Sequence, residues 1–142
     1  MQNRNYAIYI GATADQIWQT LTHSDLNRRF FFGMSIESSW RPGSALQVRS
    51  AGSVMMTGHI VEIEIGRRIV LALITNCLAD GPNAWMTWEI TEHSAGTCRV
   101  AVSHDDLEPA PDPEQDESVL WLLSNLKTVA EGAPALTPTL RL

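Results

Sequence analysis

Few side chains in this sequence combine the chemistry and the spacing of a catalytic or metal-binding site. The chain lacks the Gly-x-Ser-x-Gly nucleophile motif, the P-loop, the Gly-x-Gly-x-x-Gly fingerprint and the His-Glu-x-x-His zinc motif. Its four histidines show no ligand spacing: His23, His59, His93 and His104. Only His104 is followed by a pair of carboxylates, Asp105 and Asp106, and neighbouring strand residues point to opposite faces. We therefore expect no catalytic residue, no metal ligand and no cofactor.

Alternating rows of apolar side chains offer a different chemistry, the binding of an apolar molecule. A filled core and a lined cavity give the same alternation, so both interpretations stay open. Methionine and aromatic side chains suit adaptable apolar sites, and a histidine at the cavity mouth could hydrogen-bond a ligand. The candidate ligand-binding residues are Phe31, Trp40, Met56, Leu73, Trp88, His104 and Leu122.

Two pairs of basic residues, Arg28–Arg29 and Arg67–Arg68, interrupt this apolar pattern. The simplest interpretation of each pair is a solvated surface. The Arg28 pair also has the chemistry to recognise a carboxylate or phosphate near the cavity mouth.

Hydrophobic periodicity predicts the elements that must position these residues. A strand over Asn5–Ile10 precedes two short helices, Ala14–Thr22 and Ser24–Phe32, the first opened by a Thr13–Gln16 capping box. After Gly33 the period changes to that of strands. These strands are Ile36–Arg41, Leu46–Arg49, Val54–Ile65, Arg68–Thr75, Ala84–Thr91 and Thr97–Ser103. The apolar phase slips at Ile60–Val61, which predicts a β-bulge.

The last predicted element is a long amphipathic helix over Pro113–Glu131. Asp112 has the residue type of its N-cap, and Gly132 stands where a helix-ending glycine belongs. Short links between alternating strands favour an antiparallel sheet with one covered face. Only this helix is long enough to cover it, so we expect an α+β fold of six to seven strands around it.

Length, composition and net charge restrict the number of domains and the classes of partner. The 142 residues, 44% hydrophobic and 18% charged, predict one globular domain over residues 1–142, with 133–142 as a C-terminal tail. A net charge of −6 without a basic run argues against nucleic acid and anionic membranes as partners. The first sixteen residues lack a signal-peptide pattern, so we expect a cytoplasmic protein with free thiols at Cys77 and Cys98.

Five segments, in this order, resemble those of a known family. They are Ile10–Trp18, Gly58–Glu62 followed by Gly66–Ile69, Trp85–Ile90, Thr97–His104 and Leu123–Thr128. The chain thereby resembles the START-like helix-grip superfamily and, within it, the family related to the C-terminal domain of the activator of the heat-shock protein 90 ATPase. Two positions differ from that family: Ile65–Gly66 replace a pair of prolines, and Ser118–Val119 replace Gly-Trp near the expected cavity.

The resemblance implies a curved antiparallel sheet gripping the C-terminal helix, with an apolar cavity between them. It favours a protein that binds a small hydrophobic ligand as sensor or carrier. One alternative is a cyclase- or hydrolase-like enzyme that uses His104 with a nearby carboxylate or Tyr9. Another is a co-chaperone-type activator of an ATPase in the stress response, although the eukaryotic activators also use an N-terminal domain for which this sequence has no room.

Two tryptophans are predicted to lie away from the core. Trp121 falls opposite the apolar face of the last helix, beside Asn125 and Thr128, and Trp85 points to the outer side of the sheet. Tryptophan is enriched where proteins meet, so a homodimer through one or both surfaces is one hypothesis. The other is that residues 133–142, or the N-terminal segment, cover Trp121.

Overall fold

The computed structural model describes residues 2–74, 81–106, 113–134 and 136. Its strands and helices, in chain order, are β1 (Gln2–Ile10), α1 (Ala14–Thr22), α2 (Ser24–Phe30), β2 (Ser35–Ser38), β3 (Ala45–Ser50), β4 (Ser53–Glu64), β5 (Arg68–Ile74), β6 (Ala84–Ser94), β7 (Thr97–Asp106) and α3 (Pro113–Ala130). The expected order of elements is confirmed.

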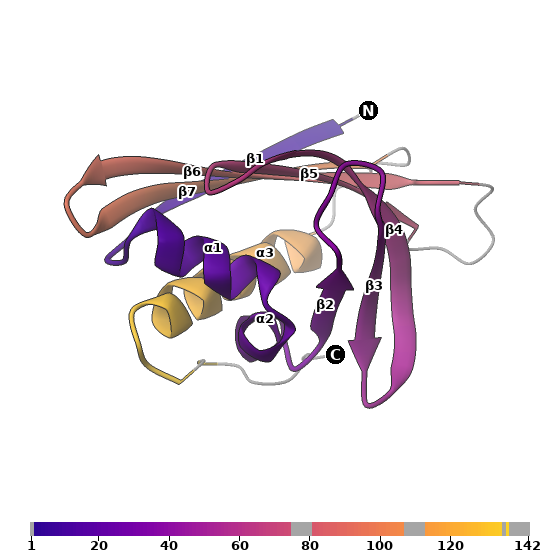
Figure 1. Ribbon diagram of the computed structural model, residues 1–142, viewed down its shortest axis with the longest axis horizontal. Coiled ribbons are helices and arrows are strands. Elements are labelled where there is room, and N and C mark those ends of the chain that lie inside the picture. Colours follow the sequence, from indigo (N-terminus) through magenta and orange to yellow (C-terminus); the bar gives the residue numbers. More distant parts are fainter. Residues whose placement is uncertain (1, 75–80, 107–112, 135, 137–142) are drawn as a thin grey trace.

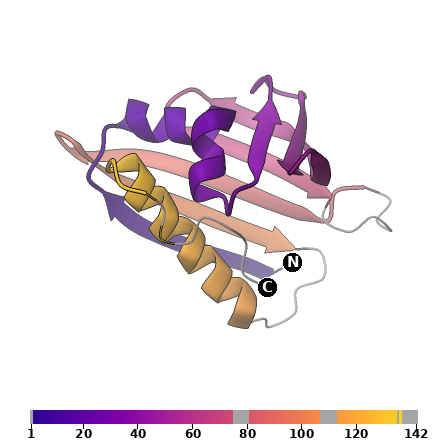
Figure 2. The same ribbon diagram turned by 90° about the horizontal axis from the view of Figure 1, so that it is seen from below.

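The strands form one antiparallel sheet in the order β1-β7-β6-β5-β4-β3-β2. The sheet is curved, and its β2–β4 end bends down beside the helices (Figure 1). All three helices lie on the same face of the sheet, with α3 on the β1 side and α2 on the β2 side (Figure 2). The α+β helix-grip architecture predicted from the sequence is therefore confirmed.

The curvature has local causes in β4. The register of β4 against β5 shifts between Ile60 and Glu62, which confirms the predicted bulge. At Gly58 a Cβ atom would lie 2.2 Å from the carbonyl oxygen of Ala72, so only glycine allows β5 this close. Both features bend the strand, as bulges and close backbone approaches do in curved sheets.

The strand predicted over Ile36–Arg41 is shorter than expected, because β2 ends at Ser38. Trp40 adopts a φ of 55°, a left-handed conformation that cannot continue a strand. The Ser38 hydroxyl accepts a hydrogen bond from the Trp40 N–H at 3.1 Å, which stabilises the turn. The alternation expected through Trp40 is therefore wrong at that residue.

The boundaries of α1 and α3 follow the capping signals, whereas α2 has no side-chain cap and ends at Phe30, two residues before the predicted end. The Thr13 hydroxyl accepts from the Gln16 N–H, and the Gln16 side chain accepts from the Thr13 N–H, so the capping box is confirmed. Helix α3 begins at Pro113 as predicted and ends one residue before the expected Glu131. Gly132 has a φ of 98°, as a helix-ending glycine should. The proposed N-cap Asp112 lies outside the described residues.

The face of α3 that the sequence places away from the core, beside Trp121, is partly covered in the structure. Asn125 is fully buried, and its side-chain oxygen accepts a hydrogen bond from the Leu136 N–H at 3.1 Å. Leu136 therefore lies beside Asn125, while residues 135 and 137–142 lie outside the described residues, so the covering of Trp121 by the tail stays a hypothesis. Trp121 on α3 and Trp85 on β6 are both half-buried.

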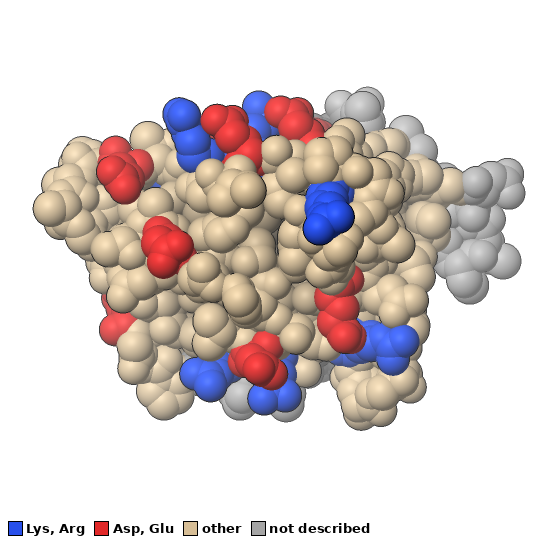
Figure 3. Space-filling view, viewed as in Figure 1, with Lys and Arg blue, Asp and Glu red and all other residues tan. Residues whose placement is uncertain are grey.

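Charged side chains of both signs are interspersed on the molecular face in Figure 3, with uncharged surface between them. The described part of this face therefore shows no extended patch of one sign that would steer a charged partner. No helix among the described residues is long and apolar enough to cross a membrane.

A polar clip joins the end of α3 to the turn after β1. The Gly11 N–H donates to Glu131 Oε2 at 2.6 Å, and the Lys127 ammonium forms an ion pair with the same oxygen. The Lys127 hydrogen bond, followed by that from Gly11, lowers the pKa of the Glu131 carboxyl. A carboxyl whose pKa is lower in the folded state stabilises that state when ionised.

We expect Glu131→Gln to lower the free energy of unfolding by less than about 1 kcal/mol at neutral pH, since solvent screens this exposed pair. The stabilisation is fully present above the ordinary glutamate pKa and is lost as the pH falls through the lowered folded pKa. The unfolding free energies of the two proteins, measured in urea, should therefore begin to approach each other below the ordinary glutamate pKa and converge below the lowered pKa of the folded state. Lys127→Gln should cause an overlapping loss, and a double variant showing fully additive losses would contradict the clip.

Candidate functional site

An apolar recess lies on the inner side of the sheet beneath α2. Ten side chains from α2, its C-terminal turn and strands β2–β6 line it: Phe30, Phe31, Ile36, Leu46, Val48, Met56, Leu71, Leu73, Met86 and Trp88. Its free volume is about 30 Å³, room for roughly two water molecules. Phe31, Met56 and Met86 are only half-buried, whereas the other seven lining residues are buried. The recess thus combines a fixed floor with movable side chains.

Strand register brings these residues together. Ile36 lies opposite Val48, and Val48 lies opposite Met56, so three strands supply one inward row. Leu71 lies opposite Met86 in the next pair of strands. Since alternate residues of a strand share a face, each of these strands presents its apolar set to α2.

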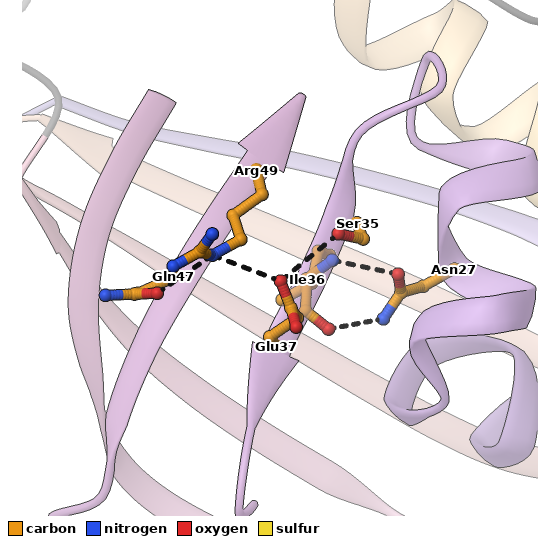
Figure 4. Close-up of polar contacts among 6 residues, drawn as sticks. All are labelled: Asn27, Ser35, Ile36, Glu37, Gln47 and Arg49. Carbon is orange, nitrogen blue, oxygen red and sulfur yellow. Dashed lines mark hydrogen bonds and ion pairs between the residues drawn. The ribbon is translucent and has the colours of Figure 1, made fainter. Parts of the chain in front are cut away.

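Helix α2 is held over the recess by a buried amide. The Ile36 N–H donates to Asn27 Oδ1 at 2.9 Å, and Asn27 Nδ2 donates to the Ile36 carbonyl at 2.8 Å (Figure 4). The same Nδ2 donates to the Leu21 carbonyl at 3.2 Å. Asn27 is fully buried, and β2 is an edge strand, so the amide pairs backbone groups that no neighbouring strand satisfies. The clamp fixes the backbone of α2, and with it the buried Phe30, relative to the sheet.

Four of the seven predicted ligand-binding residues line this recess: Phe31, Met56, Leu73 and Trp88. His104 lies on β7, opposite Met86 of β6. It is half-buried and stands one strand away from the lining. Trp40 is half-buried against the core beyond the end of β2. Leu122 is buried in the core on α3. None of these three belongs to the lining of the recess.

The described recess lies between the sheet and α2. Val119, Leu122, Leu123 and Leu126 of α3 are buried in the core. The cavity predicted between the sheet and the C-terminal helix stays a prediction.

Six lining residues were not among the predicted ligand contacts: Phe30, Ile36, Leu46, Val48, Leu71 and Met86. Leu71 and Met86 each stand two residues from a predicted contact, Leu73 and Trp88, and so share its strand face; a complete use of the alternation would have included them. The indication in the sequence that Asn27 is a buried structural residue was weaker. It precedes Phe30 by one helical turn, and a polar residue on an apolar face needs a buried partner.

A second hollow, of about 320 Å³, lies on the other face of β2 and β3. Arg28 and Arg49 both line it, together with Asp25 and Glu37. Arg28 lies 4.0 Å from Asp25, and Arg49 lies 3.3 Å from Glu37, as Figure 4 shows for the second pair. Both arginines of the described lining thus have acidic partners. Arg28 consequently lines this hollow and not the mouth of the apolar recess.

Other reactive groups stand apart from both hollows. Cys98 is buried on β7, where burial and then the charge of Glu92 raise the pKa of its thiol. The protonated thiol is a poor nucleophile. Among the residues with described positions, no three His, Cys, Asp or Glu side chains gather closely enough to hold a metal ion.

The seven-stranded sheet, the long C-terminal helix and the apolar recess define the class as a helix-grip protein. Residues 11–131 match the family described as activator of Hsp90 ATPase homolog 1-like protein, and the chain belongs to this family. No curated protein is similar enough in sequence to count as a match.

Solved structures share the fold at low sequence identity. The Aha1 dimer from Colwellia psychrerythraea has a TM-score of 0.73 and 19% identity, covering 93% of this chain and 98% of that chain. An HSP90 activator from Plasmodium falciparum has a TM-score of 0.74 and 12% identity, covering 91% of this chain and 96% of that one. A conserved protein of unknown function from Enterococcus faecalis has a TM-score of 0.73 and 16% identity, covering 94% and 75%.

We expect Asn27→Ala to lower the free energy of unfolding by about 2–4 kcal/mol, because it leaves the Ile36 backbone groups buried and unpaired. Urea denaturation measures this loss. A suitable control is Asn5→Ala: Asn5 is exposed and accepts one hydrogen bond from the Ser103 hydroxyl. That change should cost about 1 kcal/mol or less. Equal small losses in both variants would show that the amide does not hold α2.

Proposed function

We propose that the protein binds a small, largely apolar molecule in the recess beneath α2, as a sensor or carrier in the cytoplasm. The observation that carries the proposal is a recess lined by ten apolar side chains, three of them half-buried and movable. Small-molecule sites are typically concave, apolar and few per protein. Phe31, Met56, Leu73 and Trp88 would contact the ligand directly, while His104 lies one strand further along the sheet.

The ligand would enter by displacing side chains. A free volume of about 30 Å³ is too small for an organic molecule, which needs roughly ten times more. Met56 and Met86 are unbranched and half-buried, and methionine changes shape at low cost. Phe31 lies just after α2 and is half-buried as well. These three residues would form the movable side of the site, and the buried strand residues its fixed side.

A second candidate function is activation of an Hsp90 ATPase in the stress response. The family description supports it, and so do the relatives from Colwellia psychrerythraea and Plasmodium falciparum, which are named as Aha1 and as an HSP90 activator. A measurement of Hsp90 ATPase rate with and without this protein tests it. The two functions are compatible, because the recess and the outer surface are separate parts of the molecule.

We expect an uncharged fluorescent probe, N-phenyl-1-naphthylamine, to bind with micromolar affinity, about −8 kcal/mol, and to quench tryptophan emission. Met56→Ala removes a movable side chain from the lining and should tighten probe binding by about three- to tenfold. Met55, its neighbour on the other face of β4, is 54% exposed, so Met55→Ala should leave the affinity unchanged. Absence of probe binding, or equal effects of both changes, would count against the recess as the site.

The enzyme alternative makes the opposite prediction. We expect no hydrolysis of generic esters above the rate in buffer, because His104 faces Met86 across the strands and sits one strand from the recess. Release of 4-nitrophenol from nitrophenyl esters is a direct assay. Turnover that is lost in His104→Ala would favour the hydrolase-like enzyme over the ligand carrier.

We also propose a homodimer, since the Colwellia psychrerythraea relative is a dimer. Trp85 on the outer face of β6 and Trp121 on α3 are the candidate contacts, both half-buried within one chain. Sedimentation at micromolar concentration should reveal a dimer that Trp85→Ser or Trp121→Ser converts to a monomer. A monomer at every accessible concentration would contradict the homodimer.

A further inference from the structure

One polar group stands in the wall of the apolar recess. Trp88 is 5% exposed, and its indole Nε1–H donates to the sulfur of Met86 at 3.1 Å. Both residues line the recess. Among the ten described lining side chains, the indole is the one hydrogen-bond donor, because the others end in hydrocarbon or thioether groups.

This donor has a poor partner. A thioether sulfur is a weak acceptor, whereas a buried indole N–H normally finds a strong one. An oxygen atom in place of the sulfur would give a stronger bond in surroundings of low dielectric constant. The sulfur is also movable, since Met86 is half-buried and its side chain is flexible.

The aromatic rings beside the Trp88 indole favour a ligand that itself contains an aromatic ring. The Phe30 ring lies edge to face with Trp88, with centroids 6.4 Å apart and an interplanar angle of 77°. The centroids of the Phe31 and Phe30 rings are 6.2 Å apart, and their interplanar angle is 26°. Aromatic rings prefer such offset and edge-to-face contacts, so another ring inserted among them would be well accommodated.

We infer that the recess selects an aromatic, otherwise apolar molecule with a single acceptor oxygen, such as a ketone or an ether, and that Trp88 Nε1–H recognises that oxygen. The inference rests on the proposed function and adds to it the chemical class of the ligand. On binding, the oxygen replaces the Met86 sulfur as acceptor, and the Met86 side chain turns away to make room. The ligand ring then lies among Phe30, Phe31 and Trp88.

A matched pair of probes tests the oxygen. Acetophenone carries a carbonyl where cumene, nearly identical in shape, carries a CH–CH₃ unit. In wild-type protein, acetophenone should move the Trp88 indole resonance in a ¹H–¹⁵N spectrum downfield, because its proton then bonds to oxygen. Cumene should perturb methyl resonances of the lining without that downfield shift.

Two variants test the donor and its competitor separately. Met86→Leu keeps the volume but removes the sulfur acceptor, and it should tighten acetophenone binding about fivefold with cumene changed by less than about twofold. Trp88→Phe removes the donor, and it should weaken acetophenone about fivefold relative to cumene. Cumene controls for the altered cavity shape in both variants. Met86→Leu and the wild-type spectrum keep the test decisive if Trp88→Phe fails to fold.

The outcomes separate this inference from the proposed function. If both probes bind, the Trp88 resonance does not move downfield and neither variant changes their affinity ratio, recognition of oxygen by Trp88 is wrong while the apolar site stands. If neither probe binds to wild-type protein at saturation in water, the proposed function fails and the inference fails with it. A downfield shift with acetophenone and the opposite effects of the two variants would establish the donor.

Discussion

The pairing of one buried amide with an edge strand is the contact on which the candidate site depends. An edge strand presents N–H and C=O groups that need partners, and burying them unpaired is costly. Asn27 satisfies both groups of Ile36 and a carbonyl of α1 at once. Helix α2 is only seven residues long and would be marginal without tertiary contacts. Its amide therefore ties helix, edge strand and recess into one unit.

The curved sheet creates the space that this clamp covers. A bulge at Ile60–Glu62 and the close approach of Ala72 to Gly58 bend β4. Bending turns the β2–β4 end toward the helices (Figure 1). Side chains of α2, its C-terminal turn and strands β2–β6 line the recess there. Protein interiors are normally close-packed, so even a small recess lined by two methionines is a place where packing can change.

At the other side of the helical layer, α3 is fixed by contacts of a different kind. Its buried leucines pack into the core, and its end is tied to Gly11 through Glu131. The fully buried Asn125 accepts a hydrogen bond from the Leu136 N–H, so a buried polar side chain is again paired with a backbone group. Buried amides thus hold both α2 and α3 in place. In a binding protein, rearrangement would then fall to the half-buried side chains that line the recess, such as Met56 and Met86.

Local patterns in the sequence determined the order of elements, the bulge, the start of α3 and the assignment to the helix-grip fold. Periodicity and capping are properties of neighbouring residues, and they could be interpreted without knowledge of the fold. Leu73 and Trp88 of the lining followed from the same alternation, whereas Phe31 and Met56 were chosen because methionine and aromatic side chains suit adaptable apolar sites. Alternation states which face a side chain occupies, but not how far apart two layers lie, so the recess beneath α2 was not predicted. The Asn27 clamp, the turn at Trp40 and the Gly11–Glu131 contact, which joins residues 120 positions apart, were decided only when the chain packed in three dimensions.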